Sequence, residues 1–598
     1  MRGAKPAGLL SQLVWVLFSF LLPLSSIAGP LGLPDSARPG AVRPQEERST
    51  LPPTPPGEVM EIPPVIDRPF EIDEGPKVAV QQFRLLGASD LSEFEISQKE
   101  VQHILDEQLA QRPEGFTIGQ LQEVADEVTR YYREKGLILA QAIIPVQTVQ
   151  GAVVDIQLYE GKLGRVLAEG NQMYKEVVLK APFKNLIGKP VTKDRIESAL
   201  LQLTDFPGLT VFGVFQPGQQ VGTADIVLRV QEEDRFDFAY RIDDHGLRET
   251  GRYRFRPTFE WNNVTGGADR LSLSIQQTYR PKNNTFRSID YDRYLTHGFT
   301  AGINWNLNTF DVGGEFADQE ITGETKQFGV FLEKSWIRSR QMNLSTKLAL
   351  TTKDSNTRTR GRFTNEDKLS VFTLDATFDN VDTRFKGINF ATLELSRGLN
   401  NFAGSMGSHI DALQKTVGFR PSRQAGQPDG RFASGQFAKI FATGSRLQTL
   451  TSNLSLLVRG EYQWTTDFLV PMEQYSVGGP DNVRAFPPAQ ALLDRAAFIS
   501  AEFIHNMPFI TDVPAFGNRT WGELVQISAF YDHAVGRLNK PLPNDPSGYV
   551  NYKGAGVQVR FTLPSVIESR LIWAWEVGSD KADNEKSPQI WGDFTYHF

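Results

Sequence analysis

Apolar and polar residues alternate along most of the C-terminal part of the chain. The stretch LSLSIQQ, residues 271–277, places leucine and isoleucine on one face and serine and glutamine on the other. The stretch GINWNLN, residues 302–308, alternates in the same way. A period of two is the pattern of β-strands whose two faces meet different surroundings. Residues 235–598 are therefore predicted to be all-β.

The charged residues within these strands indicate what the two faces meet. Arg252, Arg254 and Arg256 alternate with aromatic residues in the middle of one predicted strand. A soluble sandwich would press one face against a second sheet, whereas a membrane barrel turns one face to lipid and the other to a wet lumen that accepts charge. Aromatic residues gather near strand ends, as they do at membrane interfaces. We expect a transmembrane antiparallel β-barrel of about 16 strands.

The region before the barrel shows helical periods between short strands. Residues 77–161 read as strand, two helices and two strands, and residues 162–234 repeat that order. In the clearest helix, residues 117–135, Thr117 and Gln120 fit a capping box and Gly136 follows the last turn. The repeated β-α-α-β-β order predicts two small α+β domains.

The N-terminal segments read as an export signal and a linker. A basic start, an apolar run and the small residues Ser26 and Ala28 predict a signal peptide over residues 1–28. Prolines are so frequent in residues 29–76 that an extended linker is expected there.

Composition narrows the range of functions. The chain has no cysteine, which excludes disulfides and cysteine-based metal sites, and its net charge of −7 gives no broad basic surface for nucleic acid. Its seven histidines show no metal-ligand spacing. We therefore expect no catalytic residue, no cofactor, no metal and no nucleic-acid partner, and the chain is not expected to be an enzyme.

Several stretches, taken in order, resemble the haemolysin secretion/activation proteins, which are outer-membrane transporters of two-partner secretion. The first unit contributes VQQFRLLG, and the second contributes LLQLTDFPGL and PGQQVGTADIVLRV. The barrel contributes RIDDHGLRETGRYR, then EQYSVGGPDNVRAFPP, and FYDHAVG further on. The resemblance extends from about Lys77 to Phe598.

The resemblance implies a location, a function and a set of partners. The barrel would lie in the outer membrane of a Gram-negative bacterium, with residues 77–161 and 162–234 as two polypeptide-transport-associated (POTRA) domains in the periplasm. These would recognise a large exported partner of the haemolysin or adhesin type, which the barrel would secrete. Outer-membrane lipid and, during biogenesis, the barrel-assembly machinery would be further partners. The alternative is a barrel-assembly or insertion factor of the same superfamily. Some members also carry an N-terminal plug, for which residues 29–76 are the candidate segment.

The resemblance also assigns a role to a loop around residues 476–490. In the family this loop folds back into the lumen, and its arginine pairs with an aspartate on an inner strand, which implies a lock between Arg484 and Asp532, with Val483 and Phe486 beside the arginine. Strand alternation independently turns Asp532 towards the lumen. Two departures concern the loop path: Ala485 stands where the family has glycine, and Gly536 lies later than expected.

Two further expectations concern strand ends and edges. Phe594, Tyr596 and Phe598 share one face of the last strand, the pattern expected of a barrel-insertion signal. Strands around residues 153–159 and 224–230 are predicted to be sheet edges at which an extended cargo segment could add a strand.

Overall fold

The computed structural model describes residues 35–38, 57–61, 75–408, 421–423, 432–541 and 548–598. The predicted signal peptide lies outside the described residues. Among the described residues, no helix combines the length and the apolar character that a helical membrane span requires.

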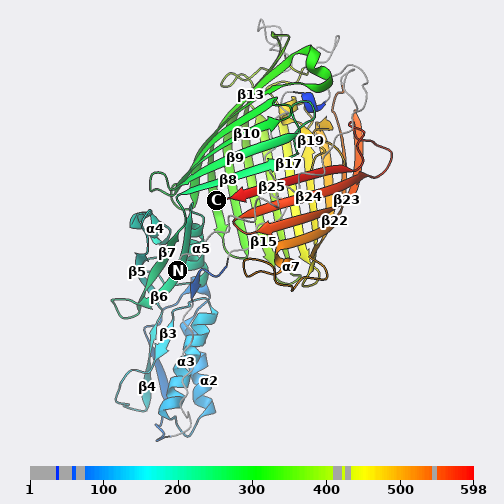
Figure 1. Ribbon diagram of the computed structural model, residues 1–598. Coiled ribbons are helices and arrows are strands. Elements are labelled where there is room, and N and C mark those ends of the chain that lie inside the picture. Colours follow the sequence, from blue (N-terminus) through cyan, green and yellow to red (C-terminus); the bar gives the residue numbers. More distant parts are fainter. Residues whose placement is uncertain (1–34, 39–56, 62–74, 409–420, 424–431, 542–547) are drawn as a thin grey trace.

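The C-terminal part forms a closed antiparallel barrel of 16 strands, as predicted (Figure 1). Neighbouring strands pair in chain order, and the last strand pairs with the first to close the barrel. The strands are β8 (Phe236–Asp243), β9 (Tyr253–Asn262), β10 (Asp269–Tyr279), β11 (Asn284–Tyr294), β12 (Phe299–Asp311), β13 (Ile321–Arg338), β14 (Met342–Thr359), β15 (Arg362–Asp382), β16 (Gly387–Gly398), β17 (Ala438–Thr449), β18 (Leu454–Trp464), β21 (Arg495–Asn506), β22 (Val525–Arg537), β23 (Tyr549–Leu563), β24 (Ile567–Glu576) and β25 (Gln589–His597).

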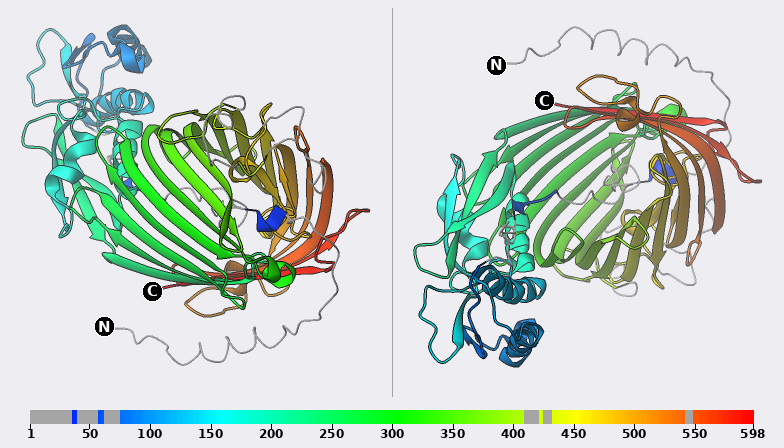
Figure 2. Two further views of the ribbon diagram at one scale, coloured as in Figure 1. Left: turned by 90° about the horizontal axis from the view of Figure 1, so that it is seen from above. Right: turned by 90° about the horizontal axis from the view of Figure 1, so that it is seen from below.

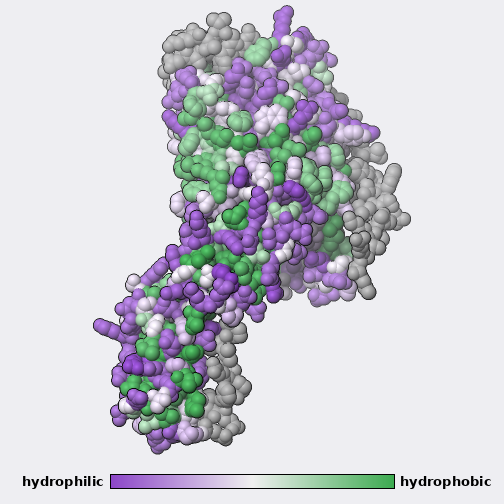
Figure 3. Space-filling model, turned by 90° about the vertical axis from the view of Figure 1, so that its left-hand side faces the viewer, coloured by the Kyte–Doolittle hydropathy of each residue, from purple (hydrophilic) through white to green (hydrophobic). Residues whose placement is uncertain are grey.

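The two faces of the barrel wall differ as the alternation predicted. Ile275, Ile303 and Phe328 are each about half exposed on the outside, whereas Gln276, Asn308 and other polar residues of the opposite parity are buried inside. In Figure 3, hydrophobic residues gather around the middle of the barrel and hydrophilic residues lie above them. An apolar band between polar ends is the outer surface that a membrane barrel requires.

The first α+β unit has a three-stranded sheet covered by two helices. Its sheet order is β2-β4-β3, with β2 parallel to β4. The capping box predicted for the second helix is present, because the Thr117 hydroxyl accepts from the Gln120 backbone N–H and the Gln120 side chain accepts from the Thr117 N–H. The elements are β2 (Gln82–Leu86), a turn η2 (Ser92–Phe94), α2 (Gln98–Gln111), α3 (Ile118–Glu134), β3 (Gln141–Ile143) and β4 (Val153–Tyr159).

The second unit repeats the order and gains a strand from the proline-rich segment. Met60 and Glu61, inside the expected linker, form β1 and pair in parallel with Gly213 and Val214 of β6. The sheet order is β1-β6-β7-β5. The elements are β1 (Met60–Glu61), β5 (Lys162–Glu169), α4 (Glu176–Lys180), η3 (Ala181–Phe183), α5 (Lys193–Thr204), β6 (Leu209–Pro217) and β7 (Thr223–Glu232).

The predicted edge strands are not edges. β4 (Val153–Tyr159) and β7 (Thr223–Glu232) each pair on both sides and lie in the interior of their sheets. The reason is the β-α-α-β-β connection, in which the last strand lies parallel to the first and antiparallel to the one before it, and so lies between them. The edges are β2 and β3 in the first sheet and β1 and β5 in the second.

The second unit lies at one end of the barrel (Figure 1) and is held there by specific side-chain contacts. Arg338 of β13 donates from Nε and Nη2 to the two carboxylate oxygens of Asp205 at 2.8 and 2.7 Å. The rings of Phe206 and Tyr294 lie 4.8 Å apart beside this pair. A fork-to-carboxylate pair with an aromatic contact gives the unit a defined orientation against the ends of β11 and β13, to one side of the ring of strands (Figure 2).

Candidate functional site inside the barrel

The loop around residues 476–490 folds into the lumen from a short hairpin. Its two strands are β19 (Tyr475–Val477) and β20 (Ala491–Leu493), which pair with each other and with no barrel strand. Gly478 has a φ of +100°, and a Cβ there would lie 2.1 Å from the Pro487 carbonyl oxygen. Glycine at this position therefore lets the loop close on itself. Short elements nearby are η4 (Gly314–Gln319) and η5 (Pro471–Glu473), whereas α7 (Trp521–Leu524) lies at the other end of the barrel, directly before β22 (Figure 1).

The structure brings Arg484 of this loop into contact with Asp532 of β22. Arg484 donates from Nε and Nη2 to Asp532 Oδ2 and Oδ1, both at 2.9 Å, and its backbone N–H donates to Oδ2 at 3.1 Å. The exposed side-chain fractions are 2% and 0%. Three hydrogen bonds from one residue to one buried carboxylate fix both the side chain and the loop backbone.

A second carboxylate, which the sequence analysis did not single out, completes the site. Glu502 of β21 accepts from Arg484 Nη1 at 2.7 Å. Ser500 accepts from Arg484 Nη2 at 3.1 Å and donates to Asp532 Oδ1 at 2.7 Å. The guanidinium carbon lies 3.3 Å from the centroid of the Phe530 ring. Alternation along AAFISAEFIHN could have found Glu502, because it places Ser500 and Glu502 on one face two residues apart.

Val483 and Phe486 seal the arginine from the rest of the lumen. Both are fully buried, and the Phe486 ring stacks on Tyr552 of β23 at 4.5 Å. Trp591 of β25 donates from Nε1 to the Arg484 carbonyl at 2.7 Å. The barrel wall accommodates alanine at position 485, where the family has glycine, because the Ala485 Cβ packs against Gly554, which has no side chain. Gly536, the displaced glycine, passes close to the Arg495 carbonyl.

A contact of opposite polarity holds the start of the loop. Asp481 accepts from Arg570 Nη1 at 2.8 Å, and Arg570 also donates from Nε to Asp593 at 2.8 Å. The Asp481 carbonyl accepts from Arg459 Nη1 at 3.2 Å. The loop thus offers a cation to carboxylates on β21 and β22 and an anion to an arginine on β24.

Part of the N-terminal segment also lies inside the barrel. The turn η1 (Asp35–Ala37) is within the ring of strands in both views of Figure 2. Asp35 Oδ2 accepts from the Leu492 backbone N–H at 3.0 Å, which links this turn to β20. Most of the candidate plug segment lies outside the described residues, and a plug remains a prediction.

The three aromatic residues of the expected insertion signal lie at the seam between β25 and β8. Tyr596 pairs with Tyr240 and Phe594 with Ile242 in the strand register. The Phe598 backbone N–H donates to the Phe238 carbonyl at 2.9 Å, and its side chain is 70% exposed. These contacts show a structural role in barrel closure; the role as a signal stays a prediction. Within the described part of the chain, no group of three or more residues is arranged to hold a metal ion.

Comparisons with known proteins agree with this architecture. Residues 222–516 match the family described as haemolysin secretion/activation protein ShlB/FhaC/HecB, and residues 78–161 match the ShlB-type POTRA domain. The haem/hemopexin transporter protein HuxB of Haemophilus influenzae is 22% identical over 471 residues, covering 78% of this chain and 77% of HuxB. The hemolysin transporter protein ShlB of Serratia marcescens is 22% identical over 500 residues, covering 79% of each chain.

A solved structure extends the agreement to the fold. CdiB from Escherichia coli superposes with a TM-score of 0.65 at 18% identity, covering 90% of this chain and 94% of CdiB. The fold therefore agrees with the sequence matches, which cover both the first periplasmic unit and most of the barrel. The chain belongs to the ShlB/FhaC/HecB family of haemolysin secretion/activation proteins and is an outer-membrane transporter of two-partner secretion.

Proposed function

We propose that this chain secretes one large partner of the haemolysin or adhesin type, and that Arg484 locks the loop around residues 476–490 against one side of the lumen. The proposal rests on the family, whose relatives are named as hemolysin and haem/hemopexin transporters. The single observation that carries the lock is the buried contact of Arg484 with both Asp532 and Glu502.

The physical argument for a lock is the cost of separating these charges. A guanidinium removed from water needs partners for its donors, and here two carboxylates and a serine hydroxyl accept hydrogen bonds from all three of its nitrogens. Breaking a buried pair by removing one partner costs about 3–5 kcal/mol, because the other charge is left unpaired. The loop therefore has one strongly preferred position in the resting transporter, and that position determines how much of the lumen is left for the cargo.

The periplasmic units supply the recognition step in this proposal. An extended cargo segment can add a strand to an unpaired sheet edge, with main-chain hydrogen bonds giving affinity. The edges that suit this role are β2 and β3 of the first unit, because in the second sheet the β6 edge is taken by Met60 and Glu61 and the start of β5 is bridged to residues 187–190. Folding of the cargo outside the cell would make each transport step hard to reverse.

The assembly-factor alternative has less support. The matches are to the secretion family in the barrel and to the ShlB-type domain in the first unit. No observation on the site favours folding of other barrels over passage of a chain through this one.

The test is made in the native host. The proteins released into the medium by a deletion strain are compared by mass spectrometry with those released after complementation with the wild-type chain. We expect one large protein to disappear on deletion and to return on complementation. An unchanged set of released proteins, together with defective insertion of other barrels, would support the assembly role instead.

A further inference from the structure

The outer face of the barrel changes character towards the cell surface, and β13 shows the change most clearly. Its outward side chains Leu332, Val330 and Phe328 are 40–48% exposed and belong to the apolar band. The next two outward residues are Lys326 and Glu324. The apolar band on this strand therefore ends at a cation, at the end away from the periplasmic units.

β11 and β15, which lie two strands away from β13 on either side, repeat this order. On β11 the outward Ile289, 45% exposed, is followed towards the surface by Arg287. On β15 the outward Phe372, 42% exposed, is followed towards the surface by the small, buried Ser370 and then by Lys368 on the same face. Three alternate strands thus carry a cation where the surface changes from apolar to polar.

The strand register makes these cations neighbours. Arg287 pairs with Leu307 of β12, and Leu307 pairs with Lys326. Lys326 pairs in turn with Asp354 of β14, and Asp354 pairs with Lys368. Since adjacent strands are about 4.8 Å apart, successive cations stand about 10 Å from each other. We call Arg287, Lys326 and Lys368 the cation row.

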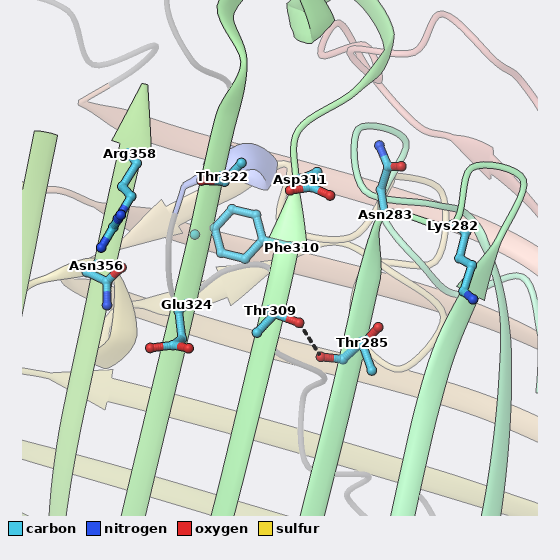
Figure 4. A pocket seen from close by; sticks show the side chains of 11 residues that line it. Lys282, Asn283, Thr285, Thr309, Phe310, Asp311, Thr322, Glu324, Asn356 and Arg358 are labelled. Atoms are coloured by element: carbon cyan, nitrogen blue, oxygen red, sulfur yellow. Dashed lines mark hydrogen bonds between the residues drawn. The ribbon is translucent and has the colours of Figure 1, made fainter. Parts of the chain in front are cut away.

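A polar hollow lies next to the cation row on the side of the cell surface. It has a volume of about 340 Å³. Figure 4 shows Thr285, Thr309, Glu324 and Asn356 standing on β11–β14 in front of the wall, with the opposite wall of the barrel behind them. Hydroxyl, amide and carboxylate groups in one hollow are suited to bind the hydroxyls of a sugar.

We propose that this face binds a phosphorylated glycolipid of the outer leaflet. The surface has three zones in sequence along the strands: an apolar band, a row of cations and a polar hollow. A lipid with acyl chains, phosphate groups and sugars has the same three zones in the same order. Acyl chains lie against Ile289 and Phe328, phosphate oxygens accept from the cation row, and the sugar fills the hollow.

The acidic neighbours of the cation row leave donors for phosphate. Lys326 Nζ contacts Glu324 at 2.6 Å, and Lys368 Nζ contacts Glu366 at 2.9 Å and Asp354 at 3.8 Å. An ammonium has three donors, so one carboxylate at Lys326 and two at Lys368 each leave at least one donor. Arg287 is exposed between the apolar Ile275 and Leu307, where its planar fork can reach a phosphate in the interface. The site lies on the outside of the barrel, so the inference does not depend on the proposed lumenal lock.

The test measures lipid binding by the full-length protein in detergent. Native mass spectrometry follows titration with bisphosphorylated lipid A, with its dephosphorylated form and with phosphatidylglycerol. The test variant is Arg287→Gln/Lys326→Gln. The matched control is Arg293→Gln/Lys334→Gln, because these residues lie on the outer faces of the same two strands, at the periplasmic end.

We expect the wild-type chain to bind bisphosphorylated lipid A roughly tenfold more tightly than either other lipid, and the test variant to lose that preference. The control variant should keep it, and both should migrate as heat-modifiable folded barrels. Equal binding of the phosphorylated and dephosphorylated forms would overturn the phosphate assignment. If the control variant loses affinity for lipid A as much as the test variant does, general charge attraction explains the binding and the cation row has no special role. If the wild-type chain binds phosphatidylglycerol as tightly as lipid A, the glycolipid assignment is wrong.

Discussion

The methyl group of Ala485 occupies the space above Gly554 of β23, so that a Cβ at position 554 would lie 2.7 Å from the Ala485 Cβ. Real Cβ contacts are essentially never this short. The alanine that departs from the family motif is thus matched by a glycine on the wall, which keeps the backbone of Arg484 close to Asp532.

This relationship predicts that Gly554→Ala displaces the loop. Overpacking of a tight contact costs about 1–3 kcal/mol, and here the loop can yield more easily than the strand. We expect lower secretion and weaker resistance of the folded chain to denaturant. The double variant Gly554→Ala/Ala485→Gly should recover both properties, because it moves the methyl group from one partner to the other.

Gly460→Ala, on the outer face of β18, is the control for replacing a strand glycine with alanine away from the loop. A Cβ there would lie 3.6 Å from the nearest atom, the Phe498 carbonyl oxygen, which is ordinary contact. If Gly460→Ala weakens secretion as much as Gly554→Ala, or if Ala485→Gly gives no recovery, the contact has no part in placing the loop.

The arginine cluster predicts an order of severity among its variants. Arg484→Ala leaves two carboxylates, Asp532 and Glu502, without their cation. Asp532→Ala leaves the arginine with one carboxylate still 2.7 Å away. We therefore expect Arg484→Ala to lower secretion and stability more than Asp532→Ala, with a cost of about 3–5 kcal/mol for the arginine. Arg484→Lys should retain only part of the secretion activity, because an ammonium cannot reproduce the planar, two-nitrogen contact of the guanidinium with Asp532.

A double-mutant cycle tests whether these residues act together. Arg484→Ala/Asp532→Ala should be no worse than Arg484→Ala alone, because it removes one of the stranded carboxylates. Secretion from the native host and denaturation of the purified barrel provide two independent measurements. Additive losses would show that the two residues contribute separately, and the lock would then be wrong.

The residues that the sequence predicted best are those whose position depends on local alternation. Asp532 could be placed on the lumenal face from its own strand, and the family motif identified Arg484. Alternation alone could have placed Glu502 on the lumenal face, but its contact with Arg484 depends on the pairing of β21 with β22 and on the depth that the loop reaches, and neither has a local pattern. The edge strands were wrongly assigned for the same reason, since sheet order is set by long-range pairing. β1 was missed because two residues, Met60 and Glu61, are too few to show a period.

Removal of the periplasmic units should separate insertion from secretion. A chain that lacks residues 57–233 and keeps its N-terminal export signal retains all 16 barrel strands, since β8 begins at Phe236. We expect this chain to reach the outer membrane as heat-modifiable barrel but to release no partner. The deletion also removes the contact between Asp205 and Arg338. Asp205→Ala in the full chain is therefore the control, because it breaks this contact between the second unit and the barrel and leaves both units in place. Undiminished release by the truncated chain would exclude recognition by these units.

Deletion of Phe598 should lower the amount of inserted barrel. The seam between β25 and β8 has five register pairs, from Asp593 with Asp243 to His597 with Ala239, and the Phe598 N–H adds a hydrogen bond to Phe238 at its end. The Phe598 ring lies 5.5 Å from Tyr240 and 4.8 Å from Tyr596. The deletion therefore removes both a closing contact and the last residue of the expected insertion signal.

Tyr240→Ala distinguishes these two effects of the deletion. It removes the aromatic contact across the seam but leaves the C-terminal residue, its N–H and the face shared by Phe594, Tyr596 and Phe598. If Phe598 acts as a signal, Tyr240→Ala should insert almost normally, while the deletion leaves little heat-modifiable protein in outer-membrane fractions. If the two variants insert equally poorly, closure of the seam explains the loss. Normal insertion of the deletion would contradict both roles, because neither recognition during assembly nor closure of the barrel would then require the terminal phenylalanine.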